Sequence, residues 1–374
     1  MPKGYYLHYH DLNDKNRKLT GIDRKVEFQI EAFNNAGLNC ELIFCEQPES
    51  TLKIIKSCLP GMPDGISWPD PDHMEEPDYL YIRRSRFASS QFIDFLKRFR
   101  IRYPDTLIIL EIPTYPYDPE MKNLRMLAAF IKDKRYRNHY KEYIDCIADL
   151  SGTETIFGIP TVQFRNGLDV NRATKRIPIE NHDVIRIMSA AFYEDWHAID
   201  RLLIGLNRYY STGGNRKIEV YLAGGGSKLP YLKRLAKRLD LEDVVFFPGV
   251  LDAEELDELY NKCTLAIECL GLYRKKMNLT PSIKAREYLA KGIPFINEGS
   301  IDIVSDENRK FIHTIPSDDS PVDIEKLIRF HNEIYNNYSQ ENVIQCIRNS
   351  SIDLIDINNT MREVIELIKV HAGV

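Results

Sequence analysis

Cationic residues gather around one predicted helix start in the second half of the chain. The segment 265–297 reads as a short apolar strand, a basic loop, a helix and a second apolar strand. Ser282 follows Pro281 at the start of that helix, and Gly292 ends it. A helix N-terminus presents unpaired N–H groups and partial positive charge, and so favours an anion. The loop and the helix add cations to this end, namely Arg274, Lys275, Lys276, Lys284 and Arg286.

These cations predict a phosphate site in which Lys284 is the main contact, with Arg274 and Arg286 as alternates. Thr280, Pro281 and Ser282 together read as the helix start, with a cap residue and a proline near the first turn, and Ser282 is expected beside the same anion. A solvated helix is the alternative interpretation, since Lys284 and Glu287 lie three residues apart and could pair on its surface. This segment taken alone leaves both interpretations open.

The same segment resembles the donor-binding region of retaining glycosyltransferases of the GT-B architecture. The similarity is to the large family (family 4, or group 1) that includes many bacterial capsule and other surface-polysaccharide enzymes. It is carried by the run Glu287-Tyr-Leu-Ala-Lys-Gly-Ile-Pro294, which matches a helix ending in a Gly-Xaa-Pro step. In that family a helix glutamate typically contacts the ribose of the sugar nucleotide, and Glu287 occupies its place. The family's second glutamate, eight residues earlier, is Leu279 here, which implies that other groups recognise the sugar.

Length and composition indicate two folded domains. The 374 residues are 43% hydrophobic and 28% charged, which is ordinary for globular domains. A net charge of −5 argues against a nucleic-acid partner. Seven scattered cysteines without a CxxC spacing favour reduced thiols in the cytosol. We expect neither a signal peptide nor a membrane span, and hence a cytoplasmic protein.

Strand and helix signals alternate in both halves of the chain, which predicts α/β domains with parallel sheets. The expected strands are 5–9, 39–44, 79–82, 106–110, 185–188, 218–222 and 244–247. We interpret this as two Rossmann-like domains with a cleft between them, as the resemblance to GT-B enzymes implies. The expected domains are 1–170 for the acceptor and 171–355 for the donor. Residues 356–374 are expected to form a helix that crosses back to the first domain.

Glycines follow two of the predicted strands in the second half. Gly224, Gly225 and Gly226 lie between a strand and a helix, where a backbone can approach a nucleotide closely. Gly249 and Val250 belong to a Phe-Pro-Gly-Val run that resembles the family step where backbone groups meet the base. Plain strand-to-loop turns are the alternative for both.

The loop after the first strand of the second half should also lie at the cleft. Family members often place an arginine and a lysine there against the diphosphate, and this chain has neither. Trp196, His197 and Arg201 are the nearest candidates. For His197, a capping or packing role is an equal alternative to ligand binding.

Several residues of the first half could contact an acceptor. Glu111 follows a buried strand, so it is a candidate base or acceptor contact, although a structural turn is the alternative. Gly21 resembles the glycine of the family's first loop, with Lys25 one turn into the next helix. Three arginines after the third strand could meet an anionic acceptor such as a lipid pyrophosphate, namely Arg83, Arg84 and Arg86.

Two further patterns concern membranes and metals. The basic, aromatic run 132–141 suggests peripheral contact with an anionic membrane, or else a solvated helix face. His8 and His10 share one face of a strand, but a metal site is not expected there because no carboxylate follows at matching spacing. The pair Asp70 and Asp72 lies in an irregular loop, so we expect no metal ion and no cofactor.

The function expected from these features is transfer of a sugar from a nucleotide-diphosphate sugar to a glycan or lipid-linked acceptor. The resemblance implies retention of configuration and a role in bacterial surface-polysaccharide synthesis. Lys284, Glu287 and Glu111 are the expected catalytic residues. A sugar-nucleotide epimerase on the same fold and a non-catalytic nucleotide-sugar-binding relative are the alternatives.

Overall fold

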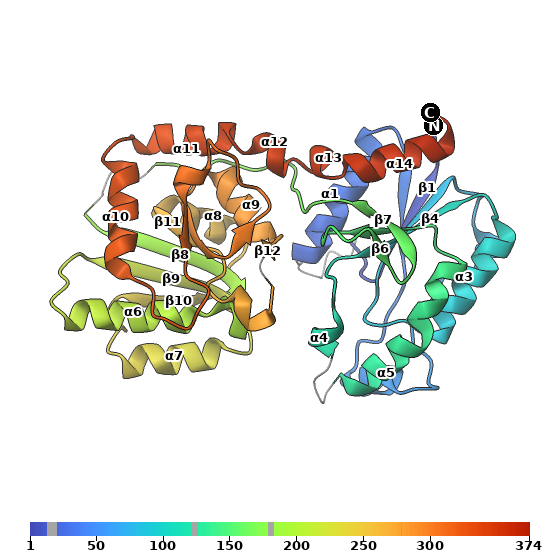
Figure 1. The fold of residues 1–374 in the computed structure, drawn as a ribbon, viewed down its shortest axis with the longest axis horizontal. Coiled ribbons are helices and arrows are strands. Elements are labelled where there is room, and N and C mark those ends of the chain that lie inside the picture. The colour runs from blue at the N-terminus through green and yellow to red at the C-terminus, as the bar shows by residue number, and fades with distance from the viewer. Residues whose placement is uncertain (13–20, 122–125, 179–182, 278) are drawn as a thin grey trace. The chain divides into compact units, whose positions relative to one another are not determined.

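The computed structural model describes residues 1–12, 21–121, 126–178, 183–277 and 279–374. Gly21, predicted to lie in a loop, is therefore the first residue described after a gap. The chain forms two compact units (Figure 1). The first unit combines Met1–Gly167 with Ile357–Val374, and the second is Leu168–Asp356.

The first unit is built on a seven-stranded sheet with the order β2-β1-β3-β4-β5-β7-β6. Every neighbouring pair is parallel except β6 and β7, which confirms the predicted parallel sheet. The order reverses between β1 and β3, and ligands of such sheets bind beyond the carboxyl ends at this switch point. The strands are β1 Gly4–His8, β2 Cys40–Phe44, β3 Tyr79–Arg83, β4 Leu107–Ile112, β5 Cys146–Asp149, β6 Thr155–Ile156 and β7 Ile159–Gln163.

Helices cover both faces of this sheet, because successive strand residues point to opposite sides. One core joins Leu80 and Ile82 to Phe92 and Phe95 of α3. The opposite core includes α1 and the C-terminal helix α14. The helices are α1 Gly21–Asn35, α2 Thr51–Cys58, η1 Pro71–His73, α3 Ser90–Arg102, α4 Asp118–Met121, α5 Leu127–Tyr136, η2 Arg137–Glu142, α13 Ile357–Thr360 and α14 Arg362–Ala372.

The C-terminal helix belongs to the first unit although the chain reaches it from the second. Val364, Ile365 and Ile368 of α14 are buried in the core that α1 covers. These residues repeat at helical spacing, so one apolar stripe holds the helix against the sheet. The last residues of the chain are thus an integral part of the first domain.

The second unit carries a six-stranded, all-parallel sheet with the order β10-β9-β8-β11-β13-β15. Counted along the unit this is the 3-2-1-4-5-6 order of dinucleotide-binding folds, with its switch point between β8 and β11. The strands are β8 Ile185–Phe192, β9 Ile218–Gly225, β10 Val245–Gly249, β11 Leu265–Ile267, β13 Phe295–Glu298 and β15 Ile312–Ile315, beside a small sheet of β12 Leu279–Thr280 and β14 Ser300–Ile301.

The helices of the second unit are η3 Asp195–His197, α6 Ile199–Ser211, α7 Leu229–Arg238, α8 Ala253–Lys262, η4 Leu272–Lys275, α9 Ile283–Lys291, η5 Arg309–Phe311, α10 Ile324–Tyr335, α11 Gln340–Asn349 and α12 Ile352–Ile355. Among the residues that the structure describes, no helix combines the length and apolarity needed to cross a bilayer.

Local signals fix the ends of α9, the helix that the sequence singles out. The Ser282 hydroxyl caps it by accepting a hydrogen bond from the Ala285 N–H at 3.3 Å. Gly292 ends it in the left-handed conformation, with φ +71°. Both predicted ends of the helix are therefore confirmed. Ala285, Tyr288 and Leu289 bury its inner face.

Candidate functional site

The switch point of the second sheet brings together residues from three segments. The chain leaves β8 toward η3, leaves β11 at Glu268, and returns at the start of α9. Lys284, in the first turn of α9, donates from Nζ to the Glu268 carbonyl oxygen at 2.6 Å. Its Nζ also lies 3.8 Å from Glu268 Oε1. The main predicted phosphate contact is thus held at the carboxyl end of β11, where a ligand is expected.

Glu268 is the residue that the sequence interpretation missed. It is 1% exposed, and its Oε2 has no hydrogen-bond partner within the described part of the chain. Leaving a carboxylate oxygen buried and unsatisfied costs free energy, so such groups cluster where a ligand or water completes the site. The available signal was an acidic residue directly after the apolar run Leu265–Ile267.

His197 lies beside these two residues and is 9% exposed. Burial and, to a smaller extent, the charge of Lys284 lower its pKa to about 3. Its Nδ1 accepts a hydrogen bond from the Glu194 N–H at 3.0 Å, so the neutral ring carries its proton on Nε2. The capping role that we considered is therefore present, and it leaves one ring N–H as a donor. We call His197, Glu268 and Lys284 the second-domain cluster.

Trp196 and Lys275 extend the cationic side of this region. The indole of Trp196 stacks on the His197 ring with centroids 5.9 Å apart. The Nζ of Lys275 lies 3.7 Å from the Trp196 ring centroid, which is a close cation–π contact. Trp196 thus orders a lysine next to the second-domain cluster.

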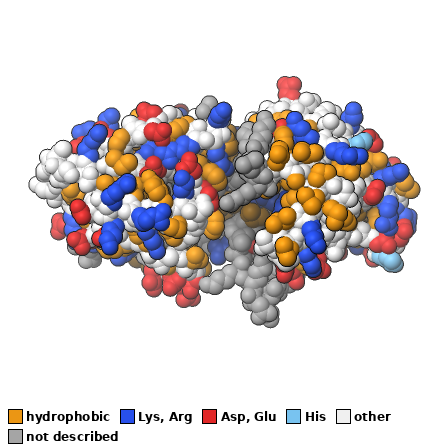
Figure 2. Space-filling model, turned by 90° about the horizontal axis from the view of Figure 1, so that it is seen from below, with side chains coloured by type: hydrophobic (Ala, Val, Ile, Leu, Met, Phe, Trp, Pro, Cys, Tyr) orange, Lys and Arg blue, Asp and Glu red, His pale blue; other side chains and the backbone are white. Residues whose placement is uncertain are grey.

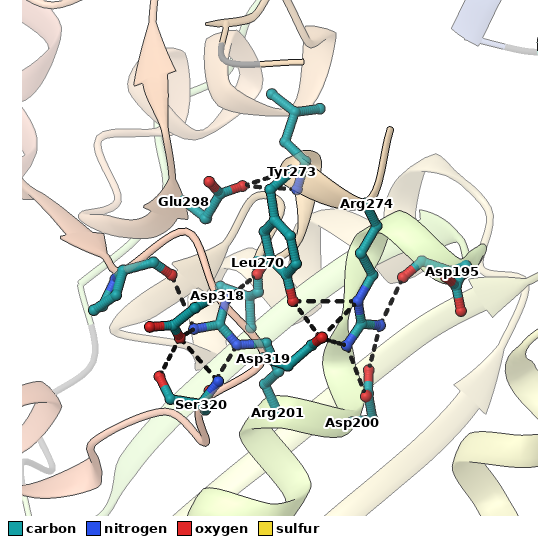
Figure 3. A network of polar contacts seen from close by, with 12 residues as sticks. Asp195, Asp200, Arg201, Leu270, Tyr273, Arg274, Glu298, Asp318, Asp319 and Ser320 are labelled. Atoms are coloured by element: carbon teal, nitrogen blue, oxygen red, sulfur yellow. Dashed lines mark hydrogen bonds and ion pairs between the residues drawn. The ribbon is translucent and has the colours of Figure 1, made fainter. Parts of the chain in front are cut away.

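Arg274, an alternate phosphate contact, is held by carboxylates instead (Figure 3). Its guanidinium donates to both oxygens of Asp200 at 3.0 Å and to Asp319 at 2.7 Å. Two carboxylates neutralise its charge, so Arg274 offers no excess positive charge here. It lines a pocket of about 370 Å³ together with Asp195, Asp200, Lys228 and Asp319.

Arg201 is also a structural cation. It is 1% exposed and donates to three backbone carbonyls, those of Leu270, Pro316 and Ser320 (Figure 3). These bonds tie the loop after β15 to the segment after β11. Arg201 therefore positions the rim of the site from inside the domain.

Arg286, the other alternate phosphate contact, is buried, and its expected donor contact stays a prediction. It is 0% exposed, and it donates to the Ser282 carbonyl at 2.9 Å and to Asp302 at 2.5 Å. Arg286 is two residues from Lys284 on the same helix, so its side chain points to a different side of the helix, toward the interior of the domain.

Glu287 is partly buried and accepts a hydrogen bond from the Tyr260 hydroxyl at 3.4 Å. Its predicted ribose contact stays a prediction.

The predicted nucleotide-binding glycines divide into two kinds. Gly224 and Gly226 have φ values of +117° and +116°, and a Cβ on either would lie 2.0–2.3 Å from backbone atoms of Ala191 or Tyr193. The neighbouring end of β8 therefore requires glycine at both positions. A Cβ on Gly225 would make only ordinary contacts. Gly249 adjoins open space, although its φ of +85° still favours glycine. Beside Gly249, Val250 is 73% exposed at the end of β10.

Glu111 is buried inside the first domain and paired there, and its expected role as a base or acceptor contact stays a prediction. It is 0% exposed and accepts hydrogen bonds from Lys25 and Gln29, both at 2.9 Å, from Tyr81 at 2.8 Å and from Arg83. Burial by itself raises the pKa of this carboxyl, but Lys25 and Arg83 outweigh it and hold the pKa at about 2. We call Lys25, Arg83 and Glu111 the first-domain cluster.

Of the other two arginines after β3, Arg84 is paired with a carboxylate and Arg86 lies on the surface. Arg84 donates to Asp133 at 3.1 Å, and its guanidinium carbon lies 3.7 Å from the Tyr117 ring centroid. Arg86 is exposed. An anion-binding group of arginines at this edge is therefore absent from the described structure, because burial and pairing take up Arg83 and Arg84.

His8 and His10 do have a carboxylate partner, which spacing along the chain did not reveal. Asp23 of α1 lies 3.2 Å from His8 Nε2 and 2.7 Å from His10 Nδ1. The three ligand atoms lie within 4.8 Å of one another, a spacing that a metal ion can bridge. Burial lowers the pKa of His8 to about 4, against the opposing effect of Asp23. Gly21, at the start of the same helix, adjoins open space.

Comparisons with known proteins identify the fold. No protein-family model and no curated protein matches the chain. A sucrose-phosphate synthase from Thermosynechococcus elongatus matches with a TM-score of 0.62 and 13% identity over 100% of both chains. HepE from Anabaena, in complex with UDP and glucose, matches with a TM-score of 0.60 and 12% identity over 99% of this chain and 100% of HepE. A trehalose-6-phosphate synthase, OtsA, matches with a TM-score of 0.64 and 11% identity over 98% and 99%. These are GT-B glycosyltransferases, and this chain has their fold of two Rossmann-like domains.

Proposed function

We propose that this protein is a glycosyltransferase that takes a sugar from a nucleotide-diphosphate donor and passes it to a glycan or lipid-linked acceptor. The structural neighbours support the class, and HepE was solved with UDP-glucose. The observation that carries the proposal is the convergence of Lys284, Glu268 and His197 at the switch point of the second sheet. We place the reaction in bacterial surface-polysaccharide synthesis at the cytoplasmic side of the membrane.

The second-domain cluster suits a reaction whose leaving group gains negative charge. The bond between the anomeric carbon and the diphosphate oxygen breaks, and the acceptor oxygen bonds to that carbon. The acceptor proton passes to the departing phosphate oxygen, so no covalent protein nucleophile is needed and configuration is retained. A lysine ammonium has three N–H donors, of which one goes to the Glu268 carbonyl. The others, with the His197 Nε2–H, would stabilise the leaving diphosphate.

Sugar recognition needs a group in place of the missing glutamate at position 279. Leu279 is 38% exposed and cannot accept a hydrogen bond. The unpartnered Oε2 of Glu268 is an acceptor in the same region. Electrostatic stabilisation of this kind requires no metal ion, and we propose a metal-independent reaction.

A thermal-shift panel tests the donor site first. UDP, GDP, ADP and their common sugar conjugates are compared on the wild type and on Lys284→Ala. A ligand at 100 times its Kd stabilises the native state by about 2.7 kcal/mol, so a bound nucleotide gives a clear shift. We expect one nucleotide to raise the Tm of the wild type and not of the variant. No shift with any nucleotide would contradict the proposal.

Incubation with the donor separates the two alternatives from transfer. An epimerase converts the sugar nucleotide without any acceptor, whereas a transferase needs an acceptor for transfer. A non-catalytic relative binds the donor and turns over nothing. The missing glutamate at 279 and the neutralised Arg274 are the observations that favour this last alternative.

A further inference from the structure

Helix α2 of the first domain exposes an apolar side that the fold does not cover. Of its eight residues, only Ser57 is buried. Leu52 and Ile55 are 73% and 55% exposed, and Leu59 directly after the helix is 43% exposed. Their spacing of three and four residues puts them along one side of the helix. A solvated helix normally turns polar residues to this side, so the apolar stripe indicates an interaction surface.

Helix α5 adds a second exposed apolar stripe next to it. Leu127 and Ile131, one turn apart, are 45% and 52% exposed. Lys132 joins the two helices, because its Nζ donates to the carbonyl oxygens of Ser57 and Met62, both at 2.7 Å. The end of α2 therefore lies against the middle of α5. We define the α2–α5 face as a set of exposed side chains on both helices and on the segment after α2, namely Leu52, Lys53, Ile55, Lys56, Leu59, Met62, Leu127, Ile131, Lys134 and Arg135.

This face differs from the basic run 132–141 that the sequence suggested for membrane contact. Lys132 is 1% exposed, and Tyr140 is buried in the core. Arg137 is paired with Asp118 at 2.5 Å and with Asp133 at 3.2 Å. These three residues of the run thus help to hold the domain together. Only its exposed residues Lys134 and Arg135 contribute to the α2–α5 face.

Basic residues surround the apolar side chains of the α2–α5 face, and this positive charge favours an anionic partner. Lys53, Lys56, Lys134 and Arg135 flank its apolar side chains, although the whole chain carries −5. Lys134 is paired with the carboxylate of Asp118 at 3.8 Å. Figure 2 shows hydrophobic and basic side chains gathered together on this side of the first domain. A second copy of the chain would set these cations against the same cations, which opposes self-association.

We propose that the α2–α5 face docks the first domain on an anionic bilayer surface. The apolar side chains enter the boundary between headgroups and acyl chains, and the four cations remain among the anionic headgroups. This inference goes beyond the proposed transfer reaction and does not rest on it. It would bring the first domain to the surface where a lipid-linked molecule is presented.

Flotation with lipid vesicles tests the proposal without any activity measurement. The wild type is mixed with vesicles of phosphatidylcholine, with or without about one third phosphatidylglycerol, at low salt. We expect binding to the anionic vesicles only, weakened as salt screens the cations. Lys53→Gln/Lys56→Gln should lower the partition coefficient about 25-fold, which is about five-fold per cation. Leu52→Asn/Ile55→Asn should lower it at least about ten-fold, because apolar burial is lost.

Val370→Asn is the matched control. Val370 is 76% exposed on α14, which packs on the opposite face of the same sheet, so its variant should bind like the wild type. All altered side chains are exposed, and unchanged melting curves will verify folding. Wild type that does not float, or α2 variants that float like it, would overturn the proposal. A concentration-dependent dimer lost in Leu52→Asn/Ile55→Asn would assign the face to a second copy and also overturn it.

Discussion

The two domains each place a glutamate and cations at the carboxyl ends of their sheets, and use them differently. In the first-domain cluster, Glu111 receives two cations and three neutral donors, and it is fully buried. In the second-domain cluster, Glu268 keeps one buried oxygen without a partner among the described residues. Lys284 there donates to a backbone carbonyl and stays 3.8 Å from the carboxylate.

This difference separates a structural ion cluster from a binding site. Breaking a fully paired buried cluster leaves uncompensated charges and costs stability. An incompletely paired cluster retains hydrogen-bonding capacity that a ligand can use. The first-domain cluster therefore stabilises its domain, and we propose donor chemistry for the second-domain cluster.

Glu111→Gln should give the largest effect on stability. The change removes a buried carboxylate that is bonded to Lys25 and Arg83, and breaking such a pair costs about 3–5 kcal/mol. Urea unfolding of both proteins measures the difference in the free energy of unfolding. Exposed ion pairs contribute less than about 1 kcal/mol. A decrease in the free energy of unfolding of that size would contradict the structural role of the first-domain cluster.

Lys284→Ala should give the largest effect on activity. Loss of one preorganised donor to a developing oxyanion costs about 3 kcal/mol, or more than 100-fold in kcat. The stability of the domain should change little, since the side chain is partly exposed and is not part of the core. Steady-state kinetics with the identified donor and acceptor measure the effect. Activity within a factor of three of wild type would refute the assigned role.

His197 should make stability depend on pH. Its folded pKa is about 3, against an ordinary value of 6.5, so the unfolded state binds more protons between these values. Stability contributed by the neutral ring is present above pH 6.5 and is lost as pH falls toward 3, by up to about 1.4 kcal/mol per pH unit. In His197→Gln, the free energy of unfolding should depend less steeply on pH, by up to that amount per pH unit. An unchanged profile would show that the ring is not buried in the neutral form.

Glu268→Gln should give the smallest stability effect and so sharpen the contrast with Glu111→Gln. The amide keeps the shape of the side chain, and the hydrogen bond of Lys284 to the backbone carbonyl remains. We expect a change in the free energy of unfolding of less than about 1 kcal/mol, the size of a weak ion pair. Unfolding curves of the two glutamine variants, recorded side by side, check this; equal losses would contradict the assignment.

Residues that are adjacent in sequence were enough to predict the alternation of secondary-structure elements and the ends of helix α9. The alternation of elements, the Ser282 cap and the Gly292 end all follow from residues adjacent in sequence. Burial of Arg286 and Glu111 could not be predicted, because the carboxylate of Asp302 and the ammonium of Lys25 come from other elements. Asp23 meets His8 and His10 only after the chain folds, for the same reason.

Site prediction from resemblance was limited in a related way. The cations at a helix start predicted Lys284 as the phosphate contact, but they do not show whether a neighbouring arginine is neutralised, as Arg274 is by Asp200 and Asp319. Glu268 lies outside the quoted family motif and was found only through its unpartnered oxygen. Pairing and burial therefore had to come from the folded structure.

Isothermal titration with UDP and GDP tests the central claim most directly, on wild type, Lys284→Ala and Lys291→Ala. Lys291 lies at the other end of α9, where it is paired with Asp257 at 2.5 Å, and serves as the matched control. We predict that one nucleotide binds wild type and Lys291→Ala alike, and binds Lys284→Ala at least about ten-fold more weakly, as loss of a charged hydrogen bond implies. Equal affinity for Lys284→Ala and wild type would contradict the claim that the second-domain cluster is the donor site.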